Sequence, residues 1–156
     1  MRKMRIYLDT SVISHLHQSQ SPEKMADTLA FWAQLKQKQY DIYISEITLR
    51  EIRGNVSSKF DVLMQCLDEI DFTLISLTDC VYAYADKLVE SGVLTSKHYA
   101  DCLHIACAVV NECDMLISWN FKHIVRVKTI NGVRTISKML GYGSIDIYPP
   151  NMMIER

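Results

Sequence analysis

Short apolar runs that alternate with longer helical patterns constrain the fold of this chain more than any other feature. The runs lie at residues 6–8, 42–44, 74–75 and 115–117. A strand that is apolar at nearly every position is covered on both faces, because a half-exposed strand would alternate apolar and polar residues. Strands that alternate with helices are typical of a mostly parallel sheet with helices on both sides. We therefore predict an α/β fold with a mostly parallel central sheet.

Cap and turn residues indicate where the connecting helices begin and end. Ser21 and Pro22 are typical of a helix start, and Gly54 and Gly141 are typical of helix ends. A short helix is expected directly after the first strand. Longer helices are predicted at residues 22–39, 45–53, 56–70, 78–90 and 95–110, with a late helix that includes residues 136–140. Residues 145–148 are predicted as an edge strand, because two prolines follow them.

Length and composition indicate a single domain that covers residues 1–156. Apolar residues make up 49% of the chain and charged residues 22%, which is ordinary for a soluble globular protein. No stretch approaches the roughly 18 apolar residues of a membrane span, and no apolar segment follows the basic N-terminus. The sequence therefore predicts a cytoplasmic protein with no membrane partner.

Net charge and cysteine usage narrow the classes of function further. The formal net charge of -1 excludes a broad cationic surface, so any nucleic acid must bind at a local patch or through metal ions. The cysteines are Cys66, Cys80, Cys102, Cys107 and Cys113. Their odd number and the absence of C-x-x-C spacing argue against a zinc site or a disulfide framework. We expect reduced thiols, with Cys102, Cys107 and Cys113 serving as small core residues.

Four polar residues are predicted to lie near one edge of the sheet: Asp9, Glu51, Asp101 and Asn120. Open α/β sheets form their ligand crevice at the carboxyl ends of parallel strands. Asp9 and Asn120 follow predicted strands, Glu51 lies about two helical turns after the second strand, and Asp101 lies in the second turn of a predicted helix. Clustered carboxylates repel one another unless a cation neutralises them, and hard oxygen ligands suit Mg²⁺ or Mn²⁺. Such ions activate water and screen the charge on a phosphate. The pattern therefore predicts a metal site for phosphodiester chemistry.

Each of these residues also has a structural interpretation. Asp9 is a suitable N-cap for the following helix, and Glu51 would complete a capping box with Thr48. Asn120 suits a turn or a cap. The alternative for Asp101 is a solvated position, although its neighbours are apolar or small and a charge among them is unusual without a partner. The sequence alone leaves these alternatives open.

Histidines and basic residues accompany the acids. His104 follows Asp101 by three residues, and a hydrogen bond to Asp101 or packing in the core is expected ahead of metal ligation. His123 follows Asn120 by three residues, and a structural role and a substrate contact remain equal alternatives. A small basic neighbourhood beside Asn120 consists of Lys122, Arg126 and Lys128. It is either a solvated face or a contact for phosphates.

Four segments together resemble the PIN domain family, in particular the VapC-like ribonucleases of bacterial toxin–antitoxin pairs. The segments are IYLDTSVISHL (6–16), SEITLREI (45–52), YADCLHIACAV (99–109) and DMLISWNFKHI (114–124). They occur in the family's order, and the resemblance extends from about residue 4 to 148. It implies a PIN-like three-layer α/β/α sandwich and a metal-dependent endoribonuclease with an acidic site.

The resemblance assigns roles residue by residue. The family's first three acids, and the hydroxyl residues after the first acid, correspond to Asp9, Glu51, Asp101, Thr10 and Ser11. Many members have aspartate at the last position, where this chain has Asn120 within a Trp-Asn-Phe-Lys-His run that is similar to a subgroup of the family. Because asparagine contributes no charge, a second metal ion would be held more weakly there.

The resulting hypothesis is hydrolysis of RNA phosphodiester bonds at a Mg²⁺ or Mn²⁺ centre, leaving a 5′-phosphate. Asp9, Glu51 and Asp101 are the predicted metal ligands, and Asn120 is a fourth predicted catalytic residue. The predicted supporting or substrate-binding residues are Thr10, Ser11, His104, Lys122 and His123. The family also implies a cognate antitoxin and, in many members, a homodimer. The alternative is a catalytically weak or inactive PIN-like module that binds RNA or protein.

Overall fold

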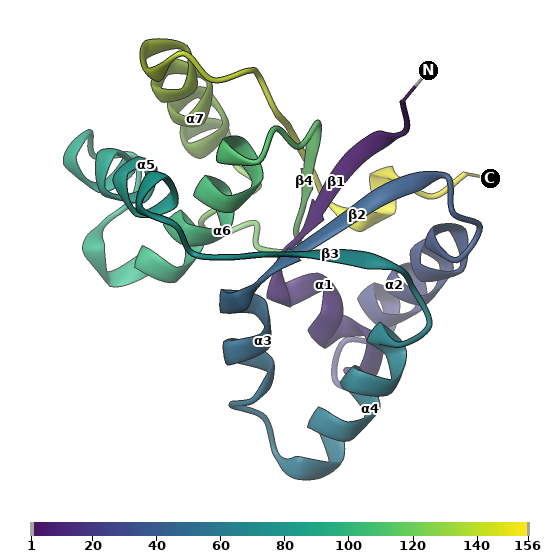
Figure 1. The fold of residues 1–156 in the computed structure, drawn as a ribbon. Helices are drawn as coiled ribbons and strands as arrows, with labels where there is room; N and C mark the ends of the chain where they lie inside the picture. Colours follow the sequence, from purple (N-terminus) through teal and green to yellow (C-terminus); the bar gives the residue numbers. More distant parts are fainter. Residues whose placement is uncertain (1, 156) are drawn as a thin grey trace.

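A parallel sheet between two helical layers forms the centre of the computed structural model, which describes residues 2–155 (Figure 1). Its five strands are β1 (Met4–Leu8), β2 (Tyr40–Ser45), β3 (Phe72–Ile75), β4 (Met115–Ile117) and β5 (Asp146–Tyr148). The strand order β3-β2-β1-β4-β5 places β1 at the centre and β5 at an edge. The predicted α/β fold with a covered parallel sheet is confirmed.

Helices cover both faces of this sheet. The helices are α1 (Thr10–Ser14), α2 (Pro22–Leu35), α3 (Glu46–Ile52), α4 (Ser57–Leu67), α5 (Asp79–Glu90), α6 (Tyr99–Val110) and α7 (Val127–Leu140), with short 3-10 turns η1 (His15–His17), η2 (Ser96–His98) and η3 (Pro150–Met152). Figure 1 shows α5, α6 and α7 on one side of the sheet and α1, α2 and α4 on the other. Helix α3 contributes Ile47 to one core and Ile52 to the other, so it bridges the two layers.

Alternation along the strands explains why the apolar runs have no polar face. Ile6 and Leu8 lie in the core under α1, α2 and α4, whereas Tyr7 between them lies in the core under α5, α6 and α7. Strand β4 repeats the pattern, because Leu116 pairs in register with Tyr7 and joins the same core. Side chains of a strand alternate between faces, so two covered faces require apolar residues at consecutive positions.

The helix boundaries follow local cap chemistry. Ser45 opens α3 through a capping box with Thr48, so Glu51 is free of the capping role that the sequence left open. The predicted helix at residues 22–39 ends earlier, because Lys38 adopts a left-handed φ of 60° as the chain turns into β2. The predicted helix at residues 95–110 is divided into η2 and α6. Gly141 ends α7 with a φ of 80°, as its glycine predicts.

Two further sequence predictions can be compared with the fold. Cys102, Cys107 and Cys113 are buried free thiols, as predicted for core residues. Within residues 2–155, no helix has both the length and the apolar content that crossing a membrane requires.

Candidate active site at the carboxyl edge of the sheet

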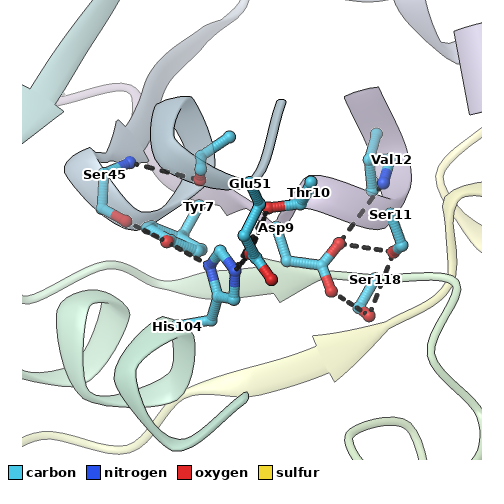
Figure 2. A network of polar contacts seen from close by, with 10 residues as sticks. Tyr7, Asp9, Thr10, Ser11, Val12, Ser45, Glu51, His104 and Ser118 are labelled. Carbon is cyan, nitrogen blue, oxygen red and sulfur yellow. Dashed lines mark hydrogen bonds and ion pairs between the residues drawn. The ribbon is translucent and has the colours of Figure 1, made fainter. Parts of the chain in front are cut away.

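Asp9 lies directly after the central strand β1, where three hydrogen bonds hold its carboxylate (Figure 2). The hydroxyls of Ser11 and Ser118 donate to its two oxygens at 2.5 Å each, and the backbone N–H of Val12 donates at 3.3 Å. Asp9 is therefore the N-cap of α1, and it is also joined to the end of the neighbouring strand β4. The cap interpretation and the site interpretation describe the same geometry.

The environment of Asp9 opposes its ionisation. Its residue surface is only 3% exposed, and this burial raises the pKa of the carboxyl above its ordinary value. The charge of His104 and the hydrogen bonds from Ser11, Ser118 and Val12 act in the opposite direction but do not cancel the effect of burial. A cation beside Asp9 would favour the ionised form, so the buried acid is suited to neutralisation by a metal ion.

Glu51 lies on α3 and is held by two donors. The hydroxyl of Thr10 donates to Glu51 Oε1 at 2.6 Å, and His104 Nε2 lies 2.6 Å from the same oxygen. Burial alone would raise the pKa of Glu51, but the hydrogen bonds from His104 and Thr10 and the charge of His104 lower it below its ordinary value. Glu51 therefore stays ionised more readily than Asp9.

His104 connects Glu51 to a buried chain of hydroxyls (Figure 2). Its Nδ1 lies 2.6 Å from the Tyr7 hydroxyl, which lies 2.7 Å from Ser45 Oγ. With a neutral His104 ring, one proton arrangement satisfies every member: Ser45 donates to Tyr7, Tyr7 donates to Nδ1, and Nε2–H donates to Glu51. Burial raises the pKa of Tyr7 well above its ordinary value, which keeps the donating proton on its oxygen.

His104 is thus a buried positioning residue for Glu51. The sequence suggested a hydrogen bond to Asp101 or packing in the core, and the second alternative is the correct one, since His104 is only 2% exposed. Its hydrogen-bond partners are Glu51, Thr10 and Tyr7 rather than Asp101. Helix α3 packs against α6, so the carboxylate of Glu51 reaches the Nε2 edge of the ring.

Asp101 lies in the first turn of α6 and is partly buried. Its carboxylate accepts no hydrogen bond from any side chain or backbone group of residues 2–155. Burial raises the pKa of Asp101, and the negative charges of Asp9 and Glu51 raise it further, while His104 and His123 oppose the increase. Asp101 therefore lies within electrostatic reach of Asp9 and Glu51.

Asn120 lies in the turn after β4 and forms part of that turn. Its side-chain Oδ1 accepts the backbone N–H of His123 at 2.9 Å, and its own N–H donates to Ser118 Oγ at 2.9 Å. Trp119, in the same turn, connects it to the Asp9 side of the site, because its backbone N–H donates to Ser11 Oγ at 2.9 Å. The side chain of Asn120 therefore has the local cap geometry that the sequence left open, and its amide NH₂ remains available to a ligand.

Beyond the acids, His98 and His123 lie close to Asp101. The imidazole rings stack with their centroids 3.7 Å apart and an interplanar angle of 27°. One ligand atom from each of His98, Asp101 and His123 lies within 4.8 Å of the other two. Within residues 2–155, the trio of Asp9, Glu51 and Asp101 is not such a group, so joint ligation of one ion requires these side chains to move inward.

A shallow pocket of about 210 Å³ opens beside the two histidines. It is lined by His98, His123, Arg126, Lys128 and the segment from Gly92 to Thr95. Lys122 is exposed nearby, and its charge and that of Arg126 contribute to the lowered pKa of His123, after burial and His98. The basic neighbourhood predicted from the sequence therefore borders the acidic edge of the sheet.

The sequence of this chain matches the profile of the PIN domain over residues 5–122. The chain belongs to the PIN domain family. A search of curated proteins gave no match. Among solved structures, the PIN domain of this chain is similar to a crystal structure of VapBC2 from Rickettsia felis bound to a DNA fragment from their promoter. That match has 15% identity and a TM-score of 0.53, and it covers 94% of this chain and 98% of the other.

A second similar structure is DNA-bound VapBC from Salmonella typhimurium, with 12% identity and a TM-score of 0.55. The match covers 94% of this PIN domain chain and 98% of the other chain. At such low identity these likenesses establish the shared fold. The predicted PIN-like α/β/α sandwich is therefore confirmed.

Several residues of this PIN domain's site were not among the predicted site residues: Tyr7, Ser45, His98 and Ser118. Ser118 and Ser45 follow or end strands, so the same rule that selected Asp9 would have placed their hydroxyls at this edge. His98 precedes Asp101 by three residues, which places the two on one helical face. Tyr7 carries no such signal, because its aromatic ring suits a buried strand without regard to its hydroxyl.

Proposed function

We propose that this PIN domain is a metal-dependent endoribonuclease that hydrolyses RNA phosphodiester bonds, and that it is the toxin of a type II toxin–antitoxin pair. The observation that carries the proposal is the set of carboxylates at the carboxyl edge of the sheet. Asp9 and Glu51 are positioned by neighbouring donors, whereas Asp101 faces them without a hydrogen-bond partner among residues 2–155. Such mutually repelling oxygens fit a hard divalent cation.

The acids fit Mg²⁺ or Mn²⁺ by their chemistry. Asp9, Asp101 and Glu51 would hold the ion, with Glu51 also orienting the attacking water. When bound, the ion supplies activation of water and stabilisation of charge on the phosphate oxygens. Ser11 and Ser118 fix the plane of the Asp9 carboxylate through their 2.5 Å hydrogen bonds.

The remaining site residues act on Glu51 and on the substrate. His104 and Thr10 both contact Glu51 Oε1 at 2.6 Å. Asn120 would donate its free amide N–H to a substrate oxygen, because its Oδ1 is already occupied by the His123 N–H. Lys122 and His123, next to the basic pocket, would contact phosphates that flank the scissile bond. Local contacts of this kind fit a chain with a net charge of -1.

A protein partner is proposed from the likeness to the two VapBC structures. We propose a cognate antitoxin that covers the acidic edge, a homodimer, and a cytoplasmic location. Co-expression with the neighbouring gene product, followed by size-exclusion chromatography with light scattering, tests the complex and the dimer together. Recovery of this chain as a monomer with no co-purifying partner contradicts both.

Metal-dependent cleavage is tested with Asp9→Asn, which replaces the anchor of the site by a neutral residue of similar shape. RNA cleavage by the variant should fall by about 100-fold or more, because a metal ion contributes several kcal/mol to the transition state. Asp146→Asn is the matched control, because Asp146 is an exposed acid at the opposite end of the sheet, where β5 begins. EDTA should abolish cleavage, and Mg²⁺ or Mn²⁺ should restore it with 5′-phosphate ends.

The neutral Asn120 favours one alternative, a catalytically weak or inactive module that binds RNA or protein. Its Oδ1 serves the turn, so the site has one charge fewer than a site with four acids. Unchanged cleavage by purified Asp9→Asn would refute the proposed site. Binding of RNA or of a protein partner by the wild type, with no cleavage of structured or unstructured RNA in either metal, would establish the alternative.

A further inference from the structure

His98, Asp101 and His123 form a group that shares Asp101 with the acidic edge. His98 ends the turn η2, Asp101 lies one helical turn later on α6, and His123 comes from the loop after β4. One ligand atom from each residue lies within 4.8 Å of the other two. Two separate segments of the chain therefore bring two imidazoles and one carboxylate together.

The ring nitrogens of this group are free to act as ligands. Neither imidazole forms a hydrogen bond with another group in residues 2–155, and the Asp101 carboxylate has none either. The loop is nevertheless held in place, because the backbone N–H of His123 donates to Asn120 Oδ1 at 2.9 Å and its carbonyl accepts the Thr129 hydroxyl at 2.5 Å. A backbone that is held in place, with side-chain nitrogens and oxygens that have no hydrogen-bond partner, suits the binding of one ion by all three residues.

We propose that His98, Asp101 and His123 bind a divalent transition-metal ion such as Zn²⁺ or Co²⁺, at a position that shares Asp101 with the Asp9 side of the site. Imidazole nitrogen suits Zn²⁺ and its first-row neighbours, whereas Mg²⁺ prefers an all-oxygen shell. Two histidines and one carboxylate supply three ligands and leave at least one position open. The position therefore selects transition metals over Mg²⁺, independently of whether the protein cleaves RNA.

The geometry requires only small side-chain movements. Ligand atoms around a tetrahedral ion with bonds near 2.0–2.1 Å lie about 3.4 Å apart, so the group must contract from separations of up to 4.8 Å. All three side chains are partly exposed, so they can rotate without disturbing the core. The stacked rings, inclined at 27°, must open further so that one nitrogen of each ring points at the same ion.

Charges on both sides of the group affect its affinity. Lys122 and Arg126 lie near His123 and oppose a cation, although the guanidinium of Arg126 is turned towards the Thr129 hydroxyl, to which its Nε donates at 3.0 Å. The negative charges of Asp9 and Glu51 act on Asp101 and favour a cation. The pocket of about 210 Å³ beside both rings provides a path for the ion and space for its open position.

The test is metal binding by the full chain without a polyhistidine tag. Co²⁺ is titrated while visible absorption is recorded, and Zn²⁺ affinity is measured by calorimetry. We expect one ion per chain, at least about tenfold weaker binding in His98→Ala and in His123→Ala, and no displacement by excess Mg²⁺. His17→Ala is the matched control, because His17 is an exposed histidine outside the group. Cys80→Ser controls for the exposed thiol.

Two results overturn the inference: equal Co²⁺ affinity in the wild type and both histidine variants, or loss of binding in the Cys80→Ser control. RNA cleavage by the wild type and by Asp9→Asn is measured alongside Co²⁺ binding, so that this inference and the proposed ribonuclease function can fail separately. Co²⁺ binding that depends on both histidines, in a protein that cleaves no RNA, supports the metal position and contradicts the ribonuclease. RNA cleavage that requires Asp9, with Co²⁺ binding that ignores both histidines, supports the ribonuclease and overturns the metal position.

Discussion

Replacement of Tyr7 by phenylalanine removes one oxygen atom from the middle of the buried hydrogen-bond chain behind Glu51. The Tyr7 hydroxyl lies 2.6 Å from His104 Nδ1 and 2.7 Å from Ser45 Oγ. Tyr7 and Ser45 are 0% exposed and His104 is 2% exposed, so water cannot readily replace the lost partner. The aromatic ring itself is retained, and the packing of the core should change little.

The expected cost follows from the partners that remain. Ser45 loses the acceptor of its hydroxyl proton but keeps the backbone N–H of Thr48 as a donor, because the capping box of α3 does not involve Tyr7. His104 Nδ1 has no such substitute, and an unpaired buried polar group costs about 1–3 kcal/mol. At this chain length each kcal/mol corresponds to about 2–4 °C, so the midpoint of thermal unfolding should fall by about 2–12 °C.

The measurement is urea and thermal denaturation followed by circular dichroism, with Tyr43→Phe as the control. Tyr43 pairs in register with Tyr7 on the adjacent strand, but its hydroxyl is not part of the buried chain. Tyr43→Phe should change the free energy of unfolding by less than about 0.5 kcal/mol. Equal stability of the two variants would show that the hydroxyl chain does not stabilise the fold. RNA cleavage should also fall in Tyr7→Phe, because His104 would hold Glu51 less rigidly.

Three further predictions concern charge and packing. Burial raises the folded-state pKa of Asp101, so ionisation of this carboxyl destabilises the folded protein as pH rises. Thermal melts in EDTA should therefore show that Asp101→Asn stabilises the protein at pH 7 but not in acid. The pKa of Asp114 is lowered, since hydrogen bonds from Arg5 and Arg2 outweigh burial. The ionised carboxylate therefore stabilises the folded protein, and this stabilisation should be lost as pH falls through the folded-state pKa. Asp114→Asn should flatten the dependence of the unfolding free energy on pH in this acid range. Gly132→Ala places a Cβ 2.7 Å from the Val93 methyls, so the free energy of unfolding in urea should fall by about 1–2 kcal/mol net of the helix propensity that alanine gains. The double variant Gly132→Ala with Val93→Ala should remove this clash.

Much of the fold could be predicted from local patterns. The apolar runs located the strands, and Ser45, Thr78 and Gly141 marked helix boundaries that the structure places at the same residues. The order of the strands could not be predicted in this way, because periodicity determines which faces are covered and not which strands are neighbours. The early end of α2 also escaped prediction, because nothing in the sequence marks Lys38 for a left-handed conformation.

The candidate site was predictable only in part for the same reason. Asp9 was selected because it follows a strand, Asp101 because it lies near the start of a helix, and Glu51 because it lies about two helical turns after a strand. Their metal binding stays a prediction. The partner of His104 did not follow, because Asp101 is three residues away in sequence, whereas Glu51 is 53 residues away and meets the ring only through the packing of α3 on α6. Long-range pairs of buried polar groups depend on tertiary packing that local spacing does not encode.

The hydrogen bond between Ser118 and Asp9 has a consequence for synthesis of the chain. The two residues are separated by 109 positions, and β4, which leads to Ser118, pairs directly with β1. At roughly 5–20 residues per second, about 5–20 s pass between the addition of Asp9 and that of Ser118. Throughout that interval the nascent chain lacks strand β4, which pairs with β1, and the Ser118 hydroxyl, which donates to Asp9. The acidic centre can therefore be assembled only after residue 118 has left the ribosome.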